Sequence, residues 1–451
     1  MNDTIVAIST PISVGAISII RVSGDDSINI VNKVFKGKDL NTVNSHTINY
    51  GHIIDKDKII DEVLVSIMKA PKTFTKEDIV EINCHGGIAT TNKILEILLN
   101  NGCRLAEPGE FTKRAFLNGR IDLVEAESVM DLINSKTELT RKMAINGVEG
   151  KISNLIKELR QSIIEILANI EVNIDYPEYE DAIIITNNIL EEKLTYIKSE
   201  INKILEKSEN TKIYKDGIKI GIFGKPNVGK SSILNALLEE DKAIVTDIEG
   251  TTRDVVEGTF ILNGISINII DTAGIRKTDD IVEKIGVEKS KKIIDEVDLI
   301  IVVLNNNEEL SNDDKEILEQ TKNKNRIIVI NKNDLERKLD IKYLKDENVI
   351  TSNTLNDNGL NELKDKIIEL FNIGNIEEKD LTYLSSARSI SLLKKCVEII
   401  NEIDISILND IPVDMIQIDL KNIWDILGEI IGESYSDELI DQLFTQFCLG
   451  K

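Results

Sequence analysis

A glycine-rich segment with a lysine is the clearest chemical feature of the chain. Residues 224–231 read Gly-Lys-Pro-Asn-Val-Gly-Lys-Ser, which is the spacing GxxxxGKS. Glycines let backbone amides converge on phosphate oxygens, and Lys230 reaches the β- and γ-phosphates of a nucleotide. Ser231 offers a hydroxyl for Mg²⁺. The segment predicts a nucleoside triphosphate site, and by itself the pattern suits ATP as well as GTP.

Three later segments extend this site and favour GTP. Thr251 and Thr252 lie in a polar stretch, GTTRD, where a mobile loop brings a hydroxyl to Mg²⁺ and the γ-phosphate. Asp271 opens the segment DTAG, whose carboxylate suits magnesium and whose Gly274 places a backbone amide near the γ-phosphate. Residues 331–334 read NKND, and an aspartate there accepts hydrogen bonds from guanine N1 and its 2-amino group. Adenine lacks that pair of donors, so the four segments together predict GTP.

One part of the usual hydrolytic machinery is missing. The residue after DTAG is Ile275, whose aliphatic side chain cannot orient the attacking water as a glutamine does. Acidic candidates for that role are Asp279, Asp280 and Glu283, and the spacing does not choose among them. No arginine is obviously placed as a finger, although Arg253 and Arg276 lie in the two expected switch regions, where solvated loop charge is the simpler interpretation. A monovalent cation can replace the finger's charge, and Asn227 either offers a side-chain oxygen for it or shapes the loop.

Strands that alternate with helices are expected to position these segments. Residues 218–223 read as a buried strand and residues 231–240 as an amphipathic helix. Further strands are expected at 258–262, 265–270, 298–304 and 326–330, with Asn263-Gly264 as a type I′ hairpin turn. Each motif then lies at the edge where α/β sheets bind ligands. The base-side loop falls on Ser352-Asn353-Thr354.

Two other kinds of domain flank this α/β region. Residues 4–117 are rich in short strand patterns with one helical stretch at 89–99, which predicts an α+β domain. Helical spacing runs through 152–170 and 190–205, stops at Asp216-Gly217, and returns after about residue 373. The expected architecture is an α+β domain, a helical domain made from two discontinuous segments, and an inserted Ras-like α/β P-loop domain. The expected ranges are 1–118, 119–213, 216–373 and 376–451.

Composition narrows the class of protein. The 78 acidic residues outnumber the 54 basic ones, which argues against a chain that binds nucleic acid by bulk electrostatics. The four cysteines form no CxxC pair, so neither a disulfide framework nor a zinc site is expected, and the natural location is the cytoplasm. Pro11 and Gly15 interrupt the apolar stretch near the start, so we expect no membrane span.

The chain resembles the tRNA uridine modification GTPases of the MnmE (TrmE) family over essentially its whole length. The motifs that carry the resemblance are DTIVAISTP, EDIVEINCHGG, EPGEFTKRAFLNGR, GKPNVGKSS, GTTRD, DTAG, NKND and the tail FCLGK. The combination is specific, because P-loop GTPases as a class share only the central motifs.

The resemblance implies a homodimer with an N-terminal domain for folate binding and dimerisation, and G domains that meet in the presence of K⁺. It assigns water orientation to Glu283 and a possible catalytic role to Cys448. Positions for 5-formyltetrahydrofolate are Arg21, Glu81, Arg120 and Lys451. Mg²⁺ falls on Ser231 and Thr252, and K⁺ on Asn227, Thr246, Ile248 and Thr251. The predicted GTP-binding residues are Asn227, Val228, Gly229, Lys230, Ser231, Ser232, Thr246, Asp247, Ile248, Glu249, Gly250, Thr251, Thr252, Asp271, Thr272, Ala273, Gly274, Asn331, Lys332 and Asp334.

The function that the resemblance implies is modification of tRNA. With a flavin-dependent partner of the MnmG (GidA) type, in a heterotetramer or larger complex, a GTPase adds a carboxymethylaminomethyl or aminomethyl group at C5 of the wobble uridine. The one-carbon unit comes from folate, and the tRNA is bound mainly through the complex. The alternative is a regulatory or ribosome-assembly GTPase switch, but such proteins usually append a basic RNA-binding module that is not visible here. A third reading is a folate enzyme that uses GTP only for regulation.

Overall fold

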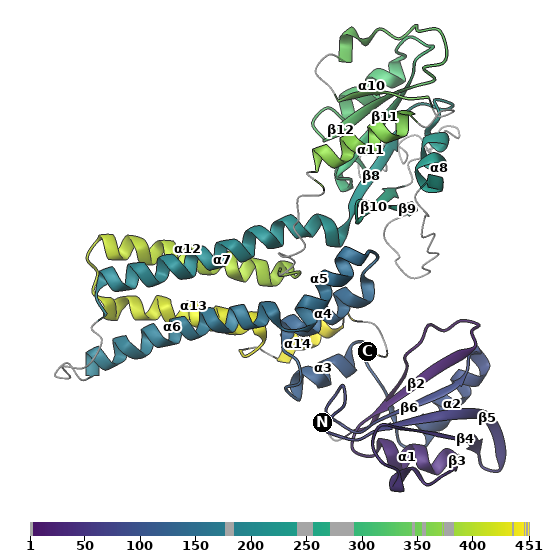
Figure 1. The fold of residues 1–451 in the computed structure, drawn as a ribbon, viewed down its shortest axis with the longest axis vertical. Coiled ribbons are helices and arrows are strands. Elements are labelled where there is room, and N and C mark those ends of the chain that lie inside the picture. Colours follow the sequence, from purple (N-terminus) through teal and green to yellow (C-terminus); the bar gives the residue numbers. More distant parts are fainter. Residues whose placement is uncertain are drawn as a thin grey trace. The chain divides into compact units, whose positions relative to one another are not determined.

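The chain contains two compact units, each assembled from separate stretches of sequence. The computed structural model describes residues 3–175, 185–240, 256–270, 293–344, 348–353, 358–371, 383–434 and 437–445, together with residues 373, 447 and 450. The first unit comprises Met1–Met130, Gly147–Ser199 and Ser386–Lys451, and the second comprises Asp131–Asn146 and Glu200–Ser385. Figure 1 shows the ribbon with its elements labelled.

The first unit contains a seven-stranded sheet with the order β3-β4-β5-β6-β2-β1-β7. All neighbouring strands are antiparallel except β1 and β7, which run parallel. Its strands are β1 (Ile5–Ile8), β2 (Ile17–Ser23), β3 (Phe35–Gly37), β4 (Thr47–Asp55), β5 (Lys58–Met68), β6 (Ile79–His85) and β7 (Arg104–Leu105). Along β5, Val63, Val65 and Ile67 are buried while the residues between them are more exposed, as period-two alternation requires.

Two helices cover the buried face of this sheet. They are α1 (Ser27–Val34) and α2 (Ile88–Asn100), and a short 3₁₀ helix, Leu40–Thr42, lies in the same part of the chain. The sequence predicted α2 and its end at Asn101-Gly102 correctly. It did not predict α1 or the later helix α3 (Glu110–Leu117), because eight residues show too few turns for helical spacing to stand out.

Further helices lie in the first unit or cross the sequence boundary between the two units (Figure 1). Their bounds are α4 (Leu123–Asn134), α5 (Glu138–Val148), α6 (Lys151–Asp175), α7 (Asn187–Asp216), α12 (Ala387–Leu408), α13 (Val413–Ile431) and α14 (Asp437–Phe444). Helix α13 packs against both α6 and α12. The expected stop of α7 before Gly217 is confirmed, and Gly217 has a φ of 74°. Among the described residues, no helix is both long and apolar enough to cross a membrane.

The second unit contains a six-stranded sheet with the order β13-β12-β11-β8-β10-β9. Every pair is parallel except β9 with β10. The strands are β8 (Ile218–Phe223), β9 (Val256–Leu262), β10 (Ile265–Ile270), β11 (Leu299–Asn305), β12 (Arg326–Asn331) and β13 (Val349–Thr351). Between β8 and residue 371 the described helices are α8 (Lys230–Glu240), α10 (Asn312–Gln320) and α11 (Asn358–Leu370), with a 3₁₀ helix at Ile341–Leu344.

Strands β8, β11 and β12 read as nearly continuous apolar runs because both faces of this sheet are covered. One buried cluster includes Ile220 and Val303, and the cluster on the other face includes Val302 and Ile328. The β9–β10 hairpin turns at Asn263-Gly264 with φ values of 47° and 82°, as the predicted type I′ turn requires. The predicted strands of this domain are confirmed to within a residue or two.

Candidate functional site

The phosphate loop joins β8 to α8 and depends on a special backbone. Gly224, Asn227 and Gly229 have φ values of 153°, 64° and 101°, in the region that favours glycine. A Cβ on Gly224 would lie 2.5 Å from the Val303 carbonyl oxygen, and one on Gly229 would collide with the Asn331 amide. These two glycines are therefore required for packing as well as for conformation.

Lys230 is the cation of this loop, and it lies at the first position of α8. Its Nζ donates hydrogen bonds to the carbonyl oxygens of Gly224 at 2.6 Å and Lys225 at 2.8 Å. No carboxylate of a described residue forms an ion pair with it, and burial lowers the pKa of its ammonium group. A half-buried cation with only carbonyl partners suits the oxygens of a phosphate chain.

The base-side segment begins at the end of β12. Asn331 is 1% exposed, and its Nδ2 donates to the Val228 carbonyl oxygen at 2.8 Å, which ties this segment to the phosphate loop. Its Oδ1 is buried and has no partner among the described residues. An unpaired buried acceptor beside an open cavity fits a bound ligand that supplies a donor. Asp334 lies exposed three residues further on.

A cavity of about 490 Å³ lies between the two segments, within the usual size range of small-molecule sites. Its lining residues are Asn227, Gly229, Lys230, Ser231, Ser232, Asn331, Lys332, Asp334, Leu335 and Asn353. Thus eight of the predicted GTP-binding residues line one cavity, while Val228 is buried beneath the loop. Leu335 was not predicted. Asn353 was named only for the base-side loop, and its position just after β13 was the available signal.

The remaining predicted nucleotide and metal positions lie outside the described residues. These are residues 246–252, residues 271–274 and Glu283. Of the predicted Mg²⁺ positions the structure describes Ser231, and of the K⁺ positions it describes Asn227; both are exposed at the cavity. The hydroxyl of Ser231 has no hydrogen-bond partner among the described residues, so it is available to a ligand.

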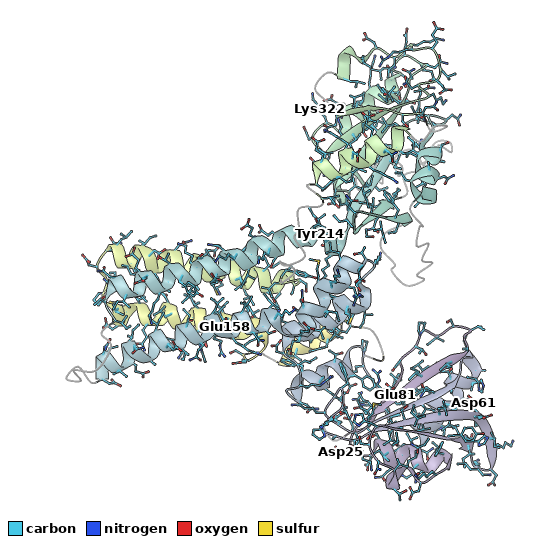
Figure 2. All side chains as sticks on the ribbon, in the orientation of Figure 1. Asp25, Asp61, Glu81, Glu158, Tyr214 and Lys322 are labelled. Atoms are coloured by element: carbon cyan, nitrogen blue, oxygen red, sulfur yellow. The ribbon has the colours of Figure 1, made fainter. Side chains whose placement is uncertain are left out.

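Three of the four predicted folate positions surround a small apolar cluster in the first unit. Arg21 on β2 and Glu81 on β6 are register partners, and their side chains form an ion pair at 2.8 Å (Glu81 is labelled in Figure 2). The Arg21 guanidinium lies 5.7 Å from the ring centre of Phe111, and the Arg120 guanidinium lies 4.9 Å from that of Phe74. Phe74 packs against the cluster that contains Phe111, so both cations border the same apolar surface.

The tail of the chain reaches this cluster. The Gly450 carbonyl oxygen accepts hydrogen bonds from Ser9 Oγ at 3.2 Å and from Arg21 Nη1 at 3.3 Å. The predicted fourth position, Lys451, lies outside the described residues, as does Cys448. Gly450, the residue before Lys451, therefore contacts Arg21 of the Arg21–Glu81 pair directly.

The loop that carries Arg120 is fastened to the loop that carries Phe74. Arg120 Nη1 donates to the Phe74 carbonyl oxygen at 3.1 Å, and Asn118 Nδ2 donates to that of Thr75 at 2.6 Å. Lys76 Nζ donates in return to the carbonyl oxygens of Asn118 and Gly119, both at 2.9 Å. The Arg120 side chain, just after the end of α3, is therefore held against the loop of Phe74.

Three of the four cysteines are described, and all three are free and buried. Burial raises the pKa of the Cys103 and Cys396 thiols to about 12 and also raises that of Cys84. Thiols in such environments are poor nucleophiles at neutral pH. His85, next to Cys84, pairs instead with Asp61, its Nδ1 lying 2.7 Å from Oδ1.

Comparison with known proteins covers the whole chain. Residues 4–120 match the family described as GTP-binding protein TrmE N-terminus, and residues 123–448 match the MnmE helical domain. Proteins named tRNA modification GTPase MnmE from Bacillus cytotoxicus and Bacillus mycoides are each 54% identical over 455 residues, covering 100% of this chain and 99% of the relative. The solved G domain of the T. maritima FeoB iron transporter is 32% identical over 34% of this chain and 97% of that chain, with a TM-score of 0.26.

The sequence relatives, rather than that weak structural likeness, decide the assignment. They extend from end to end and include both flanking domains as well as the segments that line the nucleotide cavity. The chain belongs to the family of tRNA modification GTPases MnmE.

Proposed function

We propose that this GTPase works with a flavin-dependent partner of the MnmG (GidA) type to add a carboxymethylaminomethyl or aminomethyl group at C5 of the wobble uridine of certain tRNAs. One observation carries the proposal: the chain that holds the nucleotide cavity also places Arg21, Glu81 and Arg120 around one apolar cluster that its own tail reaches. A regulatory GTPase that only switches between nucleotide states does not require this second group of charged residues. The relatives' name, tRNA modification GTPase, supports the same conclusion.

Three side chains of the nucleotide cavity have separate roles in the proposal. Lys230 binds the β- and γ-phosphates, and the amides of the phosphate loop donate to their oxygens. Asp334 accepts hydrogen bonds from guanine N1 and the 2-amino group. Ser231, with Thr252, holds Mg²⁺, which neutralises phosphate charge when bound. The Oδ1 of Asn331 and the hydroxyl of Ser231, which have no hydrogen-bond partner within the described part of the chain, support this assignment.

For hydrolysis we assign K⁺ to Asn227, Thr246, Ile248 and Thr251, and orientation of the attacking water to Glu283. The support is chemical, because Ile275 cannot orient water and no arginine finger is evident in the sequence. The exposed Asn227 side chain at the cavity is available to a second molecule or to a cation.

For the first unit we propose binding of 5-formyltetrahydrofolate or a related tetrahydrofolate by Arg21, Glu81, Arg120 and Lys451. Two guanidinium groups that lie over aromatic rings suit a ligand with carboxylates and a flat ring system. When bound, the folate supplies the one-carbon unit. The residues of this chain orient it, with Glu81 and the tail closing one side of the cluster.

The same domain, residues 1–118 in our assignment, is the proposed site of homodimerisation. Ile48 and Tyr50 on β4, Leu64 on β5 and Ile17 on β2 are 69%, 61%, 47% and 64% exposed. Tyr50 and Leu64 are register partners, so their side chains lie together on one face of the sheet. A paired double variant, Tyr50→Lys with Leu64→Lys, is expected to shift the mass measured by light scattering from dimer to monomer. Tyr196→Lys, at a 62% exposed position on α7, is the control and is expected to leave the mass unchanged.

The proposal as a whole is tested by deleting the gene and measuring the nucleosides of bulk tRNA by mass spectrometry. The C5-modified wobble uridines are expected to disappear and to return when the wild-type gene is restored, but not when an Arg120→Ala variant is supplied. Unchanged wobble uridines after deletion would refute the modification reaction. The complex with its partner, in the cytoplasm, is the expected working form.

The cation role is tested separately with the purified chain. GTP turnover is expected to be faster in potassium than in sodium at equal ionic strength, and slow in both salts for Glu283→Ala. Equal rates of the wild-type protein in the two salts would remove K⁺ from the proposal while leaving the tRNA reaction untouched.

A further inference from the structure

Lys225, the second residue of the phosphate loop, is fixed by two carboxylates that belong to another segment. Its Nζ lies 2.5 Å from Oε2 of Glu308 and 3.3 Å from Oδ2 of Asp314, and its side chain is 16% exposed. Lys225 is not among the residues that line the nucleotide cavity, and neither is Glu308. The next residue, Pro226, restricts the backbone of Lys225 to extended conformations. The ion pair therefore anchors the loop from outside the cavity.

Both carboxylates are themselves held in place. Glu308 Oε1 accepts a hydrogen bond from Asn305 Nδ2 at 2.6 Å, at the end of β11. Asp314, 3% exposed, forms the capping box of α10 with Ser311, whose backbone N and Oγ donate to Oδ2 at 3.0 and 2.7 Å. The anchor thus connects the phosphate loop to a strand end and to a helix start.

The segment after β11 also contacts the base-side loop. The Asn306 amide donates to the Asn331 carbonyl oxygen at 2.9 Å, and Asn306 Nδ2 donates to that of Leu335 at 3.1 Å. Its own carbonyl oxygen accepts from the amides of Lys338 and Leu339 at 2.9 and 3.2 Å. Residues 305–308 therefore form a brace, with the phosphate loop bound at one end and the base-side loop at the other.

We infer that Lys225 is a positioning residue for the nucleotide: through Glu308 and Asp314 it attaches the phosphate loop to the brace formed by residues 305–308, which sets the separation of the two loops that hold GTP. The Lys225 carbonyl oxygen is one of the two that Lys230 contacts, so the anchor also sets the position from which Lys230 meets the phosphates. A broken anchor loosens bound nucleotide, while Glu283, to which we assign orientation of the attacking water, belongs to another segment of the chain.

The competing explanation is that Lys225 attracts phosphate directly by its charge. The two explanations predict opposite effects for the carboxylate. If Lys225 acts by charge alone, Glu308→Gln removes a nearby negative charge and strengthens nucleotide binding. If Lys225 acts through the anchor, Glu308→Gln weakens binding as Lys225→Met does.

The test uses the full-length chain with Lys225→Met, Glu308→Gln, the double variant and Lys225→Arg. The measurements are the release rate of fluorescent mant-GDP and the KM and kcat for GTP. Lys225→Met and Glu308→Gln are each expected to accelerate release roughly tenfold, which corresponds to about 1.4 kcal/mol, and to raise KM similarly with kcat within twofold. The double variant should match Lys225→Met, because that substitution already removes the contact with Glu308 together with the contact with Asp314. Lys225→Arg should restore release to within about threefold.

A more exposed lysine–carboxylate ion pair in the same unit provides the control. Lys324 Nζ lies 3.1 Å from Asp295 Oδ1, next to the starts of β12 and β11 and thus at the sheet edge opposite the nucleotide. Lys324→Met and Asp295→Asn should leave release and KM unchanged. Slower or unaltered release from Glu308→Gln, or additive effects in the double variant, overturns the inference. Circular dichroism melts check folding, and Glu308→Asp serves as the carboxylate variant if Glu308→Gln does not fold.

Discussion

Removal of the buried guanidinium of Arg114 is expected to destabilise α3. Arg114 is 1% exposed, and its Nη1 donates to the Asp3 carbonyl oxygen at 2.9 Å and to Glu77 Oε1 at 3.0 Å. Its Nη2 donates to Asp3 Oδ1 at 2.8 Å and to Glu110 Oε1 at 3.0 Å. A further bond joins Nη1 to Glu77 Oε2 at 3.3 Å, and Arg114→Met keeps most of the volume while it removes all five bonds. Truncating one partner of a buried ion pair costs about 3–5 kcal/mol.

The carboxylates that Arg114 contacts keep other partners after the substitution, so we expect a loss of stability near the lower end of that range. Glu110 keeps Arg104, whose Nη1 lies 3.0 Å from Oε2, and the Glu107 amide. Glu77 keeps the hydroxyl of Ser23 at 2.7 Å but has no cation left in the described contacts of its side chain. A loss of ~3 kcal/mol corresponds to roughly 100-fold faster hydrogen exchange of the α3 amides at pH 7.

The assay is hydrogen exchange followed by mass spectrometry, with peptides that cover α3 and α2. Lys93→Met, which breaks exposed ion pairs of α2 with Asp55 and Glu96, is the control and should change α2 exchange less than about threefold. Folate binding should weaken in Arg114→Met, because α3 carries the loop of Arg120. A change in α3 exchange of less than about threefold would show that the network does not hold the helix.

At lower pH, the hydrogen-exchange rates of the α3 amides in Arg114→Met and in the wild-type protein are expected to become more similar. Burial raises the pKa of Glu110, but hydrogen bonds from Arg104, the Glu107 amide and Arg114 outweigh it and leave the pKa below its ordinary value. A carboxyl with a lowered pKa contributes stability above its unfolded pKa and loses it as the pH falls through the folded pKa. The gap in α3 exchange, corrected for intrinsic rates, is therefore expected to shrink on acidification, and a constant gap would contradict the ionic origin.

Three further predictions concern single side chains. Lys230→Met should weaken GTP binding about 100-fold in calorimetry, since a charge-assisted contact is lost, and near wild-type affinity would remove Lys230 from the phosphate site. Asp334→Asn should lower the affinity for guanine nucleotides about 1000-fold and raise the affinity for xanthine nucleotides, because the C2 carbonyl of xanthine accepts a hydrogen bond from an amide. If the variant still prefers GTP, the proposed base contact is excluded. The hydrogen bond and charge of Asp61 raise the pKa of the exposed His85, so Asp61→Asn should lower the pKa measured by NMR, and an unchanged titration would disprove the pairing.

Local sequence patterns predicted the second unit well, because its motifs and strands depend on the backbone conformation and burial of residues that are close together along the chain. Glycines at 224 and 229 are required by backbone conformation, and the apolar runs of β8, β11 and β12 follow from burial on both faces. Given these strands, the C-terminal edge of a parallel sheet brings the phosphate and base segments to one cavity. Helices α1 and α3 were missed because eight residues are too short for periodicity to distinguish a helix from other structure.

The nucleotide motifs, the helical stripes and the strands β8 to β12 could be predicted from the sequence alone, because each depends on neighbours within a few turns or one strand. The pairing of charges that are distant along the chain is visible only in the folded structure. Arg114 pairs with Asp3 across 111 positions, Arg21 with Glu81 across 60, and Lys225 with Glu308 on a separate strand end. Charged residues normally face solvent, so nothing in their local sequence marks these as buried or anchored. Their partners are fixed by sheet register and by loop closure, which are properties of the whole fold.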